Sequence, residues 1–284
     1  MFRLRADGLL RWIMTVAAVT AGAVLVLIVA FLLAEAAGAL RTVGPAGFLT
    51  HGNWRPAEGL YGLAPIVSGT LLVAGGALLL AIPLGIASAV FVHHYAPPLL
   101  AAPYRRVIEL MAGVPSVVYG FWGLVTVVPL IGLVRPPGSS VLAGVLILTL
   151  MVLPMMALTA YAALAEVSYS YLDAAAALGL SRWGTVRSVI LPAARTGIAT
   201  GAVLSVGRAV GETMAVLMVT GNVVQVPDGV FEPVRVLTAN IALEMGYALD
   251  EHRGALFVTG LLLLLVVVGA VVLAEALERR EAHR

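Results

Sequence analysis

The chain has 284 residues, and 61% of them are hydrophobic before its 30 glycines are counted, while only 11% are charged. Soluble domains are about 45–50% apolar with glycine included and about 25% charged. A chain of this length with a mean hydropathy of +1.03 has far more apolar surface than a water-soluble core can bury. The composition therefore predicts an all-α, polytopic membrane protein.

Two residue types are missing, and each absence excludes a class of chemistry. There is no cysteine, which excludes disulfides, thiolate catalysis and cysteine-ligated metals. All 17 basic residues are arginine, so the lysine of a Walker-type phosphate loop is also missing. If ATP drives this protein, a partner must hydrolyse it. The formal net charge is +2, and the arginines behind it are expected to orient the chain in the membrane and not to bind nucleic acid.

Six apolar segments are long enough to cross a bilayer as helices, which takes about 20 residues each. The spans are predicted at about 12–34, 63–92, 110–134, 141–165, 197–221 and 254–274, and they form one transmembrane domain over residues 1–284. The first segment could instead be a signal peptide. Its apolar run exceeds the roughly 7–15 residues of such a peptide's core, which favours an uncleaved helix.

Arginine placement predicts the orientation of these spans. With the N-terminus inside, eleven of the 17 arginines fall on the cytoplasmic side and five outside, and Arg208 lies within a span. The positive-inside rule then places both termini in the cytoplasm. It also assigns residues 166–194 to a cytoplasmic loop and residues 223–253 to an external loop.

The cytoplasmic loop has more helical order than a flexible connection needs. Asp173 opens an alanine-rich stretch that suits a helix, and Gly179 suits the position just after a helix C-terminus. Ser181 can then cap a second helix. Two short helices that meet at a glycine and carry Trp183 would form a knob. The alternative is an amphipathic hairpin on lipid headgroups, anchored by Trp183.

This loop resembles the EAA loop of ABC importer permeases. The family pattern is Glu-Ala-Ala, three residues, Gly, nine residues, Ile, one residue, Leu-Pro. Its spacing is matched from Asp173 to Pro192, with Asp in place of Glu and Val189 in place of Ile. The resemblance implies the type I ABC importer permease architecture, in which cytoplasmic coupling helices dock onto an ATP-binding subunit dimer. The residues that it assigns to this contact are Asp173, Ala174, Ala175, Gly179, Leu180, Ser181, Arg182 and Trp183.

The fifth span carries a charged pair. Arg208 lies about eleven residues into it, or about 17 Å at a rise of about 1.5 Å per residue, which is near the bilayer centre. Glu212 follows four residues later and would share its face in a continuous helix. The pair could be a buried ion pair that fixes helix register, or the guanidinium could bind an oxyanion that Glu212 helps to position. Small residues at 197/201 and 207/211 predict close helix packing along this span.

Four stretches, at residues 47–71, 109–124, 207–222 and 236–248, resemble the phosphate permeases of the PstC type. The resemblance implies that the chain forms half of the pathway of an ATP-driven inorganic phosphate importer in a bacterial inner membrane. The implied partners are a sister permease of the PstA type, the ATP-binding dimer, an external phosphate-binding protein and membrane lipid. It implies no nucleotide site in this chain and no cofactor, and the adjacent His93 and His94 lack the i,i+4 spacing that would suggest a metal site. By residue chemistry alone, the Arg–Glu pair would suit sulfate or molybdate equally well.

The hydroxyls beside Pro115 and the acidic external loop can each be interpreted in two ways. Ser116 and Tyr119 lie beside Pro115, where hydroxyls could contact the anion in transit or satisfy backbone groups that the proline leaves free. The external loop has five acidic residues and two arginines, so it would repel a free anion. That sign favours delivery by a docked binding protein, and the alternative is a solvated loop without a role.

Two other classes of function fit the residues less well. An intramembrane enzyme lacks candidates, because the five histidines lie at span ends or outside and no Gly-x-Ser-x-Gly motif occurs. A proton-coupled secondary anion transporter would suit the Arg–Glu pair. It would leave the organised cytoplasmic loop without a purpose.

Overall fold

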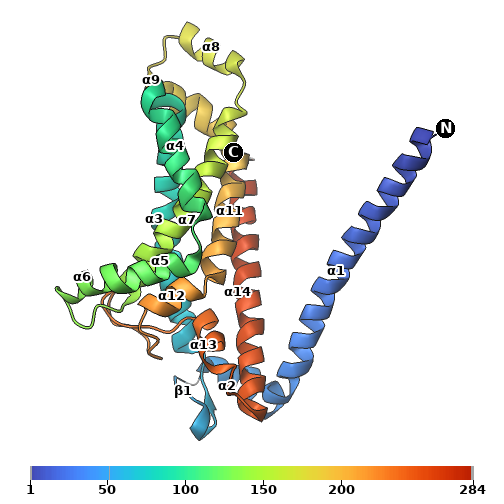
Figure 1. The fold of residues 1–284 in the computed structure, drawn as a ribbon, viewed down its shortest axis with the longest axis vertical. Helices are drawn as coiled ribbons and strands as arrows, with labels where there is room; N and C mark the ends of the chain where they lie inside the picture. The colour runs from blue at the N-terminus through green and yellow to red at the C-terminus, as the bar shows by residue number, and fades with distance from the viewer. Residues whose placement is uncertain (1, 51, 283–284) are drawn as a thin grey trace.

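A computed structural model describes residues 2–50 and 52–282, and its elements are almost entirely helical (Figure 1). Met1, His51, His283 and Arg284 lie outside these residues. Four helices are long and apolar enough to cross a membrane within the described chain. They are α1 (Phe2–Thr42), α3 (Ala64–Val90), α7 (Val141–Ala165) and α14 (Asp250–Ala282). They match the first, second, fourth and sixth predicted spans.

The third predicted span contains a sharp bend between two helices, and the fifth begins just after a second such bend. In one, α4 (Pro98–Gly113) meets the helical run of α5 (Ser116–Trp122), a π-helical turn (Gly123–Val127) and α6 (Val128–Gly132) at 97°. In the other, residues Arg182–Ala193 meet α11 (Arg195–Gly211) at 70°. The described chain therefore has six spans only when each bent pair counts as one.

The first of these bends has a local cause. At the first bend Val114 is extended, with ψ 129°, because a following proline disfavours the helical conformation. Pro115 also lacks the N–H that a helix would use. The predicted fifth span, 197–221, is interrupted where α11 ends at Gly211, and a separate short helix, α12 (Met214–Val219), follows.

The core of the bundle is the contact between α3 and α7, where glycines bring the helices close together. A Cβ atom on Gly85 of α3 would lie 2.7 Å from Cγ of Met156 on α7. A Cβ atom on Gly144 of α7 would lie 3.0 Å from a methyl group of Val73 on α3. Side chains from α7, including Ile147 and Met156, are fully buried around this contact. The close packing fixes the scaffold on which the bent pairs lie.

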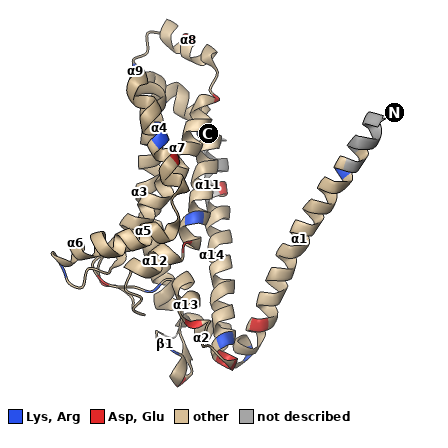
Figure 2. Ribbon diagram, viewed as in Figure 1, with Lys and Arg blue, Asp and Glu red and all other residues tan. Residues whose placement is uncertain are grey.

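Small elements cover the two ends of the bundle. At one end, here named the hairpin end, lie α2 (Pro45–Thr50), the antiparallel pair β1 (Trp54–Arg55) and β2 (Leu60–Tyr61), and α13 (Leu237–Glu244). At the other, the knob end, α8 (Tyr169–Ala177) and α9 (Arg182–Thr185) project beyond the long helices (Figure 1). Charged residues gather toward both ends, and the helices between them carry few (Figure 2).

Helix α1 leans away from the bundle over most of its length (Figure 1). It meets α14 near its own C-terminal end, where the rings of Phe31 and Phe257 stand edge to face with centroids 5.6 Å apart. The most apolar stretch of α1 has no buried residue. No other described part of this chain covers that apolar surface. This is expected of a helix that contacts lipid or another membrane protein.

Candidate functional site

The break after α11 falls between the two charged residues that the sequence placed on one helical face. Gly211 ends the helix, and Glu212 is extended, with φ −69° and ψ 131°. The Glu212 carboxylate accepts a hydrogen bond from the backbone N–H of Ala215 at 3.3 Å, so it caps the start of α12. The expectation of a continuous helix that places Arg208 and Glu212 on one face is therefore wrong, and no ion pair joins these two side chains.

Arg208 lies in the last turn of α11 and its side chain is exposed on the surface of the chain. Thirteen residues separate it from Arg195 at the start of the helix, which is about 20 Å at about 1.5 Å per residue. The position near a helix C-terminus is electrostatically favourable for a cation. Arg208 is therefore an exposed cation in a helix that has no other charged residue after Arg195.

The break before α5 places the two predicted hydroxyl residues differently. The Tyr119 hydroxyl donates to the backbone carbonyl of Met111 at 2.9 Å, which ties α5 back to α4 across the bend. This contact matches the alternative in which the hydroxyl satisfies backbone groups near Pro115. Ser116 is the first residue of α5 and is half-buried.

The two half-helices that follow the breaks, α5 and α12, pack on each other. A Cβ atom on Gly120 of α5 would lie 2.7 Å from the Cα atom of Ala215 on α12. Ala215 is also the residue whose N–H is bonded by Glu212. The half-helices α5 and α12 therefore pack on each other close to the Glu212 break.

The small residues of α11 have two different surroundings. Close to the start of the helix, a Cβ on Gly197 would lie 2.5 Å from Cβ of Ala163 on α7, and a Cβ on Gly201 would collide with Thr159. This half of the packing prediction is confirmed. The other two glycines, Gly207 and Gly211, do not pack against a neighbouring helix. A Cβ on either would meet no described atom within 4 Å. The part of α11 around Arg208 is therefore open within this chain.

The predicted knob is present at the end of the bundle opposite the hairpin. Gly179 has φ +68°, the left-handed conformation expected after a helix C-terminus, and the Ser181 hydroxyl accepts from the N–H of Gly184 at 3.1 Å. Trp183 is exposed. One boundary differs from the prediction, since α8 begins at Tyr169 and not at Asp173, because Ser168 caps it. Of the remaining residues assigned to the ATPase contact, Ala175 is buried, and Asp173, Ala174, Leu180 and Arg182 are exposed.

A buried polar cluster at the hairpin end was missed by the sequence analysis. The Glu244 carboxylate is 6% exposed and accepts from Nε1 of Trp54 at 2.8 Å and from Nη1 of Arg235 at 2.5 Å. It also lies 2.8 Å from Nε2 of His252. The acidic loop that was predicted to be external is therefore not uniformly solvated. We name the set Trp54, Arg235, Glu244 and His252 the hairpin clamp.

Tyr61 lies beside the hairpin clamp. Its burial raises the pKa of its hydroxyl, and the negative charge of Glu251 raises that pKa further.

Helix α13 connects this clamp to the Glu212 break. Glu244 is its last residue, and Thr238 lies in its first turn. The Thr238 hydroxyl donates to the backbone carbonyl of Glu212 at 2.8 Å. Both ends of α13 are thus held by side-chain hydrogen bonds, one at the hairpin and one beside the break. Among the described residues, no group of three or more His, Asp or Glu side chains is arranged to hold a metal ion.

Known proteins share both the sequence and the fold. Residues 81–283 match the family described as binding-protein-dependent transport system inner membrane component. A probable ABC transporter permease protein, YqgH of Bacillus subtilis, is 39% identical over 79% of this chain and 74% of its own length. The phosphate transport system permease protein PstC of Haemophilus influenzae is 33% identical over 88% of this chain and 87% of its own.

A solved structure extends the likeness to the fold. A bacterial ABC transporter involved in the import of the acidic polysaccharide alginate superposes with a TM-score of 0.69 at 15% identity, over 98% of this chain and 99% of that one. The bent spans, the knob and these matches agree on one architecture. The chain belongs to the family of binding-protein-dependent transport system inner membrane components, the membrane-spanning permeases of ABC importers.

Proposed function

We propose that this chain is the PstC-type permease subunit of an ATP-driven inorganic phosphate importer and forms half of its translocation pathway. Its partners would be a PstA-type sister permease, an ATP-binding subunit dimer, which would hydrolyse the ATP, and an external phosphate-binding protein. The complex would lie in a bacterial inner membrane with the knob end and both termini in the cytoplasm. Support comes from the PstC relative and from the four stretches that resemble phosphate permeases.

The observation that carries this proposal is the position of Arg208. An arginine near the bilayer centre costs about 2.5–3.5 kcal/mol on insertion scales, so it is rarely left facing lipid. Arg208 is exposed on this chain, and the glycines beside it, Gly207 and Gly211, have no packing partner here. A water-filled pathway at the interface with a sister permease would accommodate all three. There the planar guanidinium would bind two oxygens of a phosphate.

Glu212 has a separate role in this proposal. Its side chain caps α12 and its carbonyl accepts from Thr238, so it holds the break that turns the chain away from Arg208. A break at this point lets α11 move with the knob while α12 stays with α5 and α13. Closure of the ATPase dimer would move the knob, and α11 would carry that motion to the pathway around Arg208. Ser116, at the start of the neighbouring half-helix, would contact phosphate in transit, whereas Tyr119 would hold the bend.

Two alternatives remain as outcomes of a single experiment. The chain is co-reconstituted with its partners in proteoliposomes, and phosphate uptake is measured with competing sulfate or molybdate. We expect uptake to require ATP and to resist both competitors. Equal competition by sulfate or molybdate would assign another oxyanion. Uptake that needs a proton gradient and no ATPase subunit would contradict the ABC mechanism and favour a secondary anion transporter.

A further inference from the structure

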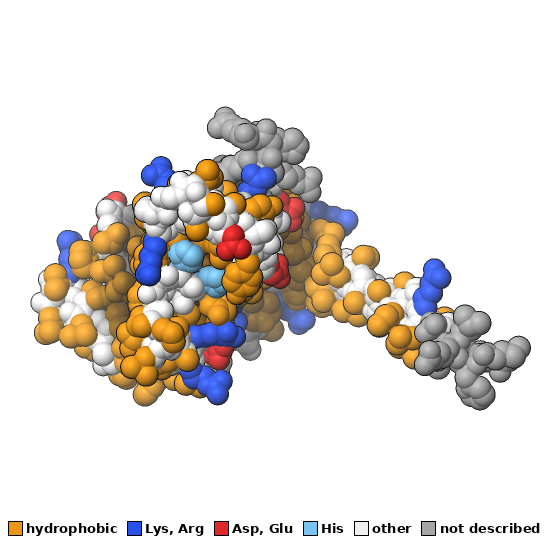
Figure 3. Space-filling view, turned by 90° about the horizontal axis from the view of Figure 1, so that it is seen from above, with side chains coloured by type: hydrophobic (Ala, Val, Ile, Leu, Met, Phe, Trp, Pro, Cys, Tyr) orange, Lys and Arg blue, Asp and Glu red, His pale blue; other side chains and the backbone are white. Residues whose placement is uncertain are grey.

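A charged cavity lies at the knob end, away from both α11 and the hairpin clamp. Its volume is about 640 Å³, and its lining comes from α4, from Val92 in the π-helical turn after α3 (Phe91–Tyr95) and from Tyr161 of α7. Figure 3 shows the molecule from this end, where basic, acidic and histidine side chains lie among hydrophobic ones. None of the transport roles proposed above uses this cavity.

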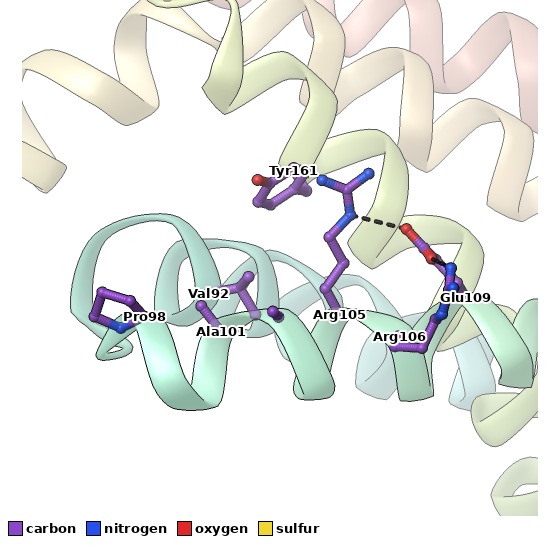
Figure 4. Close-up of a pocket in the computed structure, with 8 residues that line it drawn as sticks. Val92, Pro98, Ala101, Arg105, Arg106, Glu109 and Tyr161 are labelled. Atoms are coloured by element: carbon purple, nitrogen blue, oxygen red, sulfur yellow. Dashed lines mark hydrogen bonds and ion pairs between the residues drawn. The ribbon is translucent and has the colours of Figure 1, made fainter.

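One side of the cavity holds an arginine in a fixed position. The Arg105 guanidinium lies over the Tyr161 ring, 4.8 Å from its centroid, and its Nε donates to Glu109 at 2.8 Å. Arg106 also approaches Glu109, at 3.5 Å, and its side chain is 77% exposed (Figure 4). Two arginines against one carboxylate leave a net charge of +1. Because Tyr161 and Glu109 already hold Arg105, it loses little conformational freedom when it binds an anion.

The other side of the cavity is apolar and lies close to the expected membrane boundary. Val92, Pro98 and Ala101 line it, opposite Arg105 and Arg106 (Figure 4). The outer surface of α4 carries strongly exposed apolar side chains, among them Leu99 at 85% and Leu110 at 67%. A helix that combines exposed leucines with arginines is typical of the zone where acyl chains meet headgroups.

We infer that this cavity binds the phosphate group of an anionic phospholipid in the cytoplasmic leaflet. Arg105 and Arg106 would contact the phosphate oxygens, and the apolar side would receive the glycerol and the first methylenes of the chains. Free phosphate offers the same oxygens to the arginines. A lipid would also fill the apolar side, and the exposed leucines of α4 suit contact with its acyl chains. The inference depends on the proposed orientation and not on which anion is transported.

The test is lipid binding to the purified full-length chain in neutral detergent. Dioctanoyl phosphatidylglycerol is titrated while thermal unfolding is followed by tryptophan fluorescence. A lipid that binds only the folded state raises the midpoint in a saturable manner. We expect this rise for phosphatidylglycerol and a much weaker response to dioctanoyl phosphatidylcholine. Arg105→Gln and Arg106→Gln should each weaken the apparent affinity by about tenfold, the effect of losing one charge-assisted hydrogen bond.

The matched control is Arg11→Gln, which removes an exposed arginine from α1. It should bind phosphatidylglycerol as the wild type does. Arg106 is highly exposed, so its variant reports on the site even if Arg105→Gln does not fold. Equal binding by wild type and Arg106→Gln, or an equal loss in Arg11→Gln, would overturn the inference. Displacement of the lipid by inorganic phosphate would overturn the lipid assignment, because the site would then bind the free anion.

Discussion

At the scale of single residues, Glu244 is a buried carboxylate whose charge is matched by its neighbours. Its partners come from the β-hairpin, from the segment before α13 and from α14. The side chains of Arg235 and His252 are only 18% and 15% exposed. A buried pair of this kind adds little stability over an apolar replacement, but removal of one partner is expensive because the other charge stays buried.

We therefore expect Glu244→Gln to lower the free energy of unfolding by about 3 kcal/mol, the lower end for a broken buried pair because Arg235 keeps some exposure. Denaturation of the purified chain in detergent measures this change. Glu58→Gln is the matched control, since the Arg55–Glu58 pair is 61% and 56% exposed and should contribute less than about 1 kcal/mol. Equal losses in the two variants would contradict the role assigned to the hairpin clamp.

Arg208 gives a second prediction for a single residue, and it concerns transport. Arg208→Gln keeps hydrogen-bonding capacity but removes the charge, so ATP-driven phosphate uptake should fall by at least about tenfold, the effect of losing one charge-assisted contact. The variant complex should still assemble, because the exposed side chain of Arg208 supports no core packing. Uptake and co-purification of the ATPase subunit are measured on the same preparation. Normal uptake would leave Arg208 with a structural role only.

At the scale of elements, apolar length predicted where helices lie better than where they break. Pro115 marks a real bend, whereas Pro83 and Pro154 lie inside α3 and α7, which continue through them. The break at Glu212 has no proline before it. It depends on the carboxylate that caps α12 and on Thr238, which is 26 residues away in the sequence. The cap is local, three residues long, but the Thr238 bond is tertiary, so a spacing rule for continuous helices could not anticipate it.

The knob was predictable because its signals are local. Gly179 and Ser181 act through their own backbone and through the next few residues, and both have the expected conformations. The hairpin clamp was not predictable, because its members are spread between Trp54 and His252 and none is unusual in its own segment. Buried polar groups in a membrane protein require partners, and the sequence identifies the groups without identifying the pairs.

The contact between α5 and α12 gives a prediction about packing. Gly120→Val should destabilise the chain by about 1–3 kcal/mol, because its side chain would enter the space occupied by the Ala215 backbone. Gly75→Val is the matched control in α3, where a Cβ meets no described atom within 4 Å. Thermal unfolding in detergent compares the two. A control variant as unstable as Gly120→Val would show that the loss reflects helix propensity and not this contact.

The knob gives a prediction about coupling. Gly179→Pro imposes φ near −65° on a residue at +68°, and Trp183→Asp places a charge on an exposed aromatic position, so either should uncouple ATP hydrolysis from the loaded binding protein. Gly179→Asn tolerates the left-handed conformation and should retain coupling. ATPase activity in proteoliposomes is the measurement, with the amount of permease in the membrane as reference. Loss of coupling in Gly179→Asn as well would argue against a purely conformational role for the glycine.

At the scale of the whole molecule, the two ends of the bundle are expected on opposite sides of the membrane. The natural absence of cysteine makes this directly testable, because one introduced thiol is the only target for a maleimide. Ala57→Cys, on the exposed hairpin, should react with an impermeant maleimide in intact spheroplasts. Ser170→Cys, on the exposed surface of α8, should react only after permeabilisation. The reverse pattern would invert the proposed topology.

The hydrogen bond from Trp54 to Glu244 joins residues 190 positions apart, and this separation sets an order of events during synthesis. Synthesis adds about 5–20 residues per second, so Glu244 is added roughly 10–40 seconds after Trp54. His252, the third contact, arrives with the last span. The hairpin end is therefore completed only when α14 is made, and a chain arrested earlier has an incomplete hairpin clamp that distinguishes it from a mature subunit.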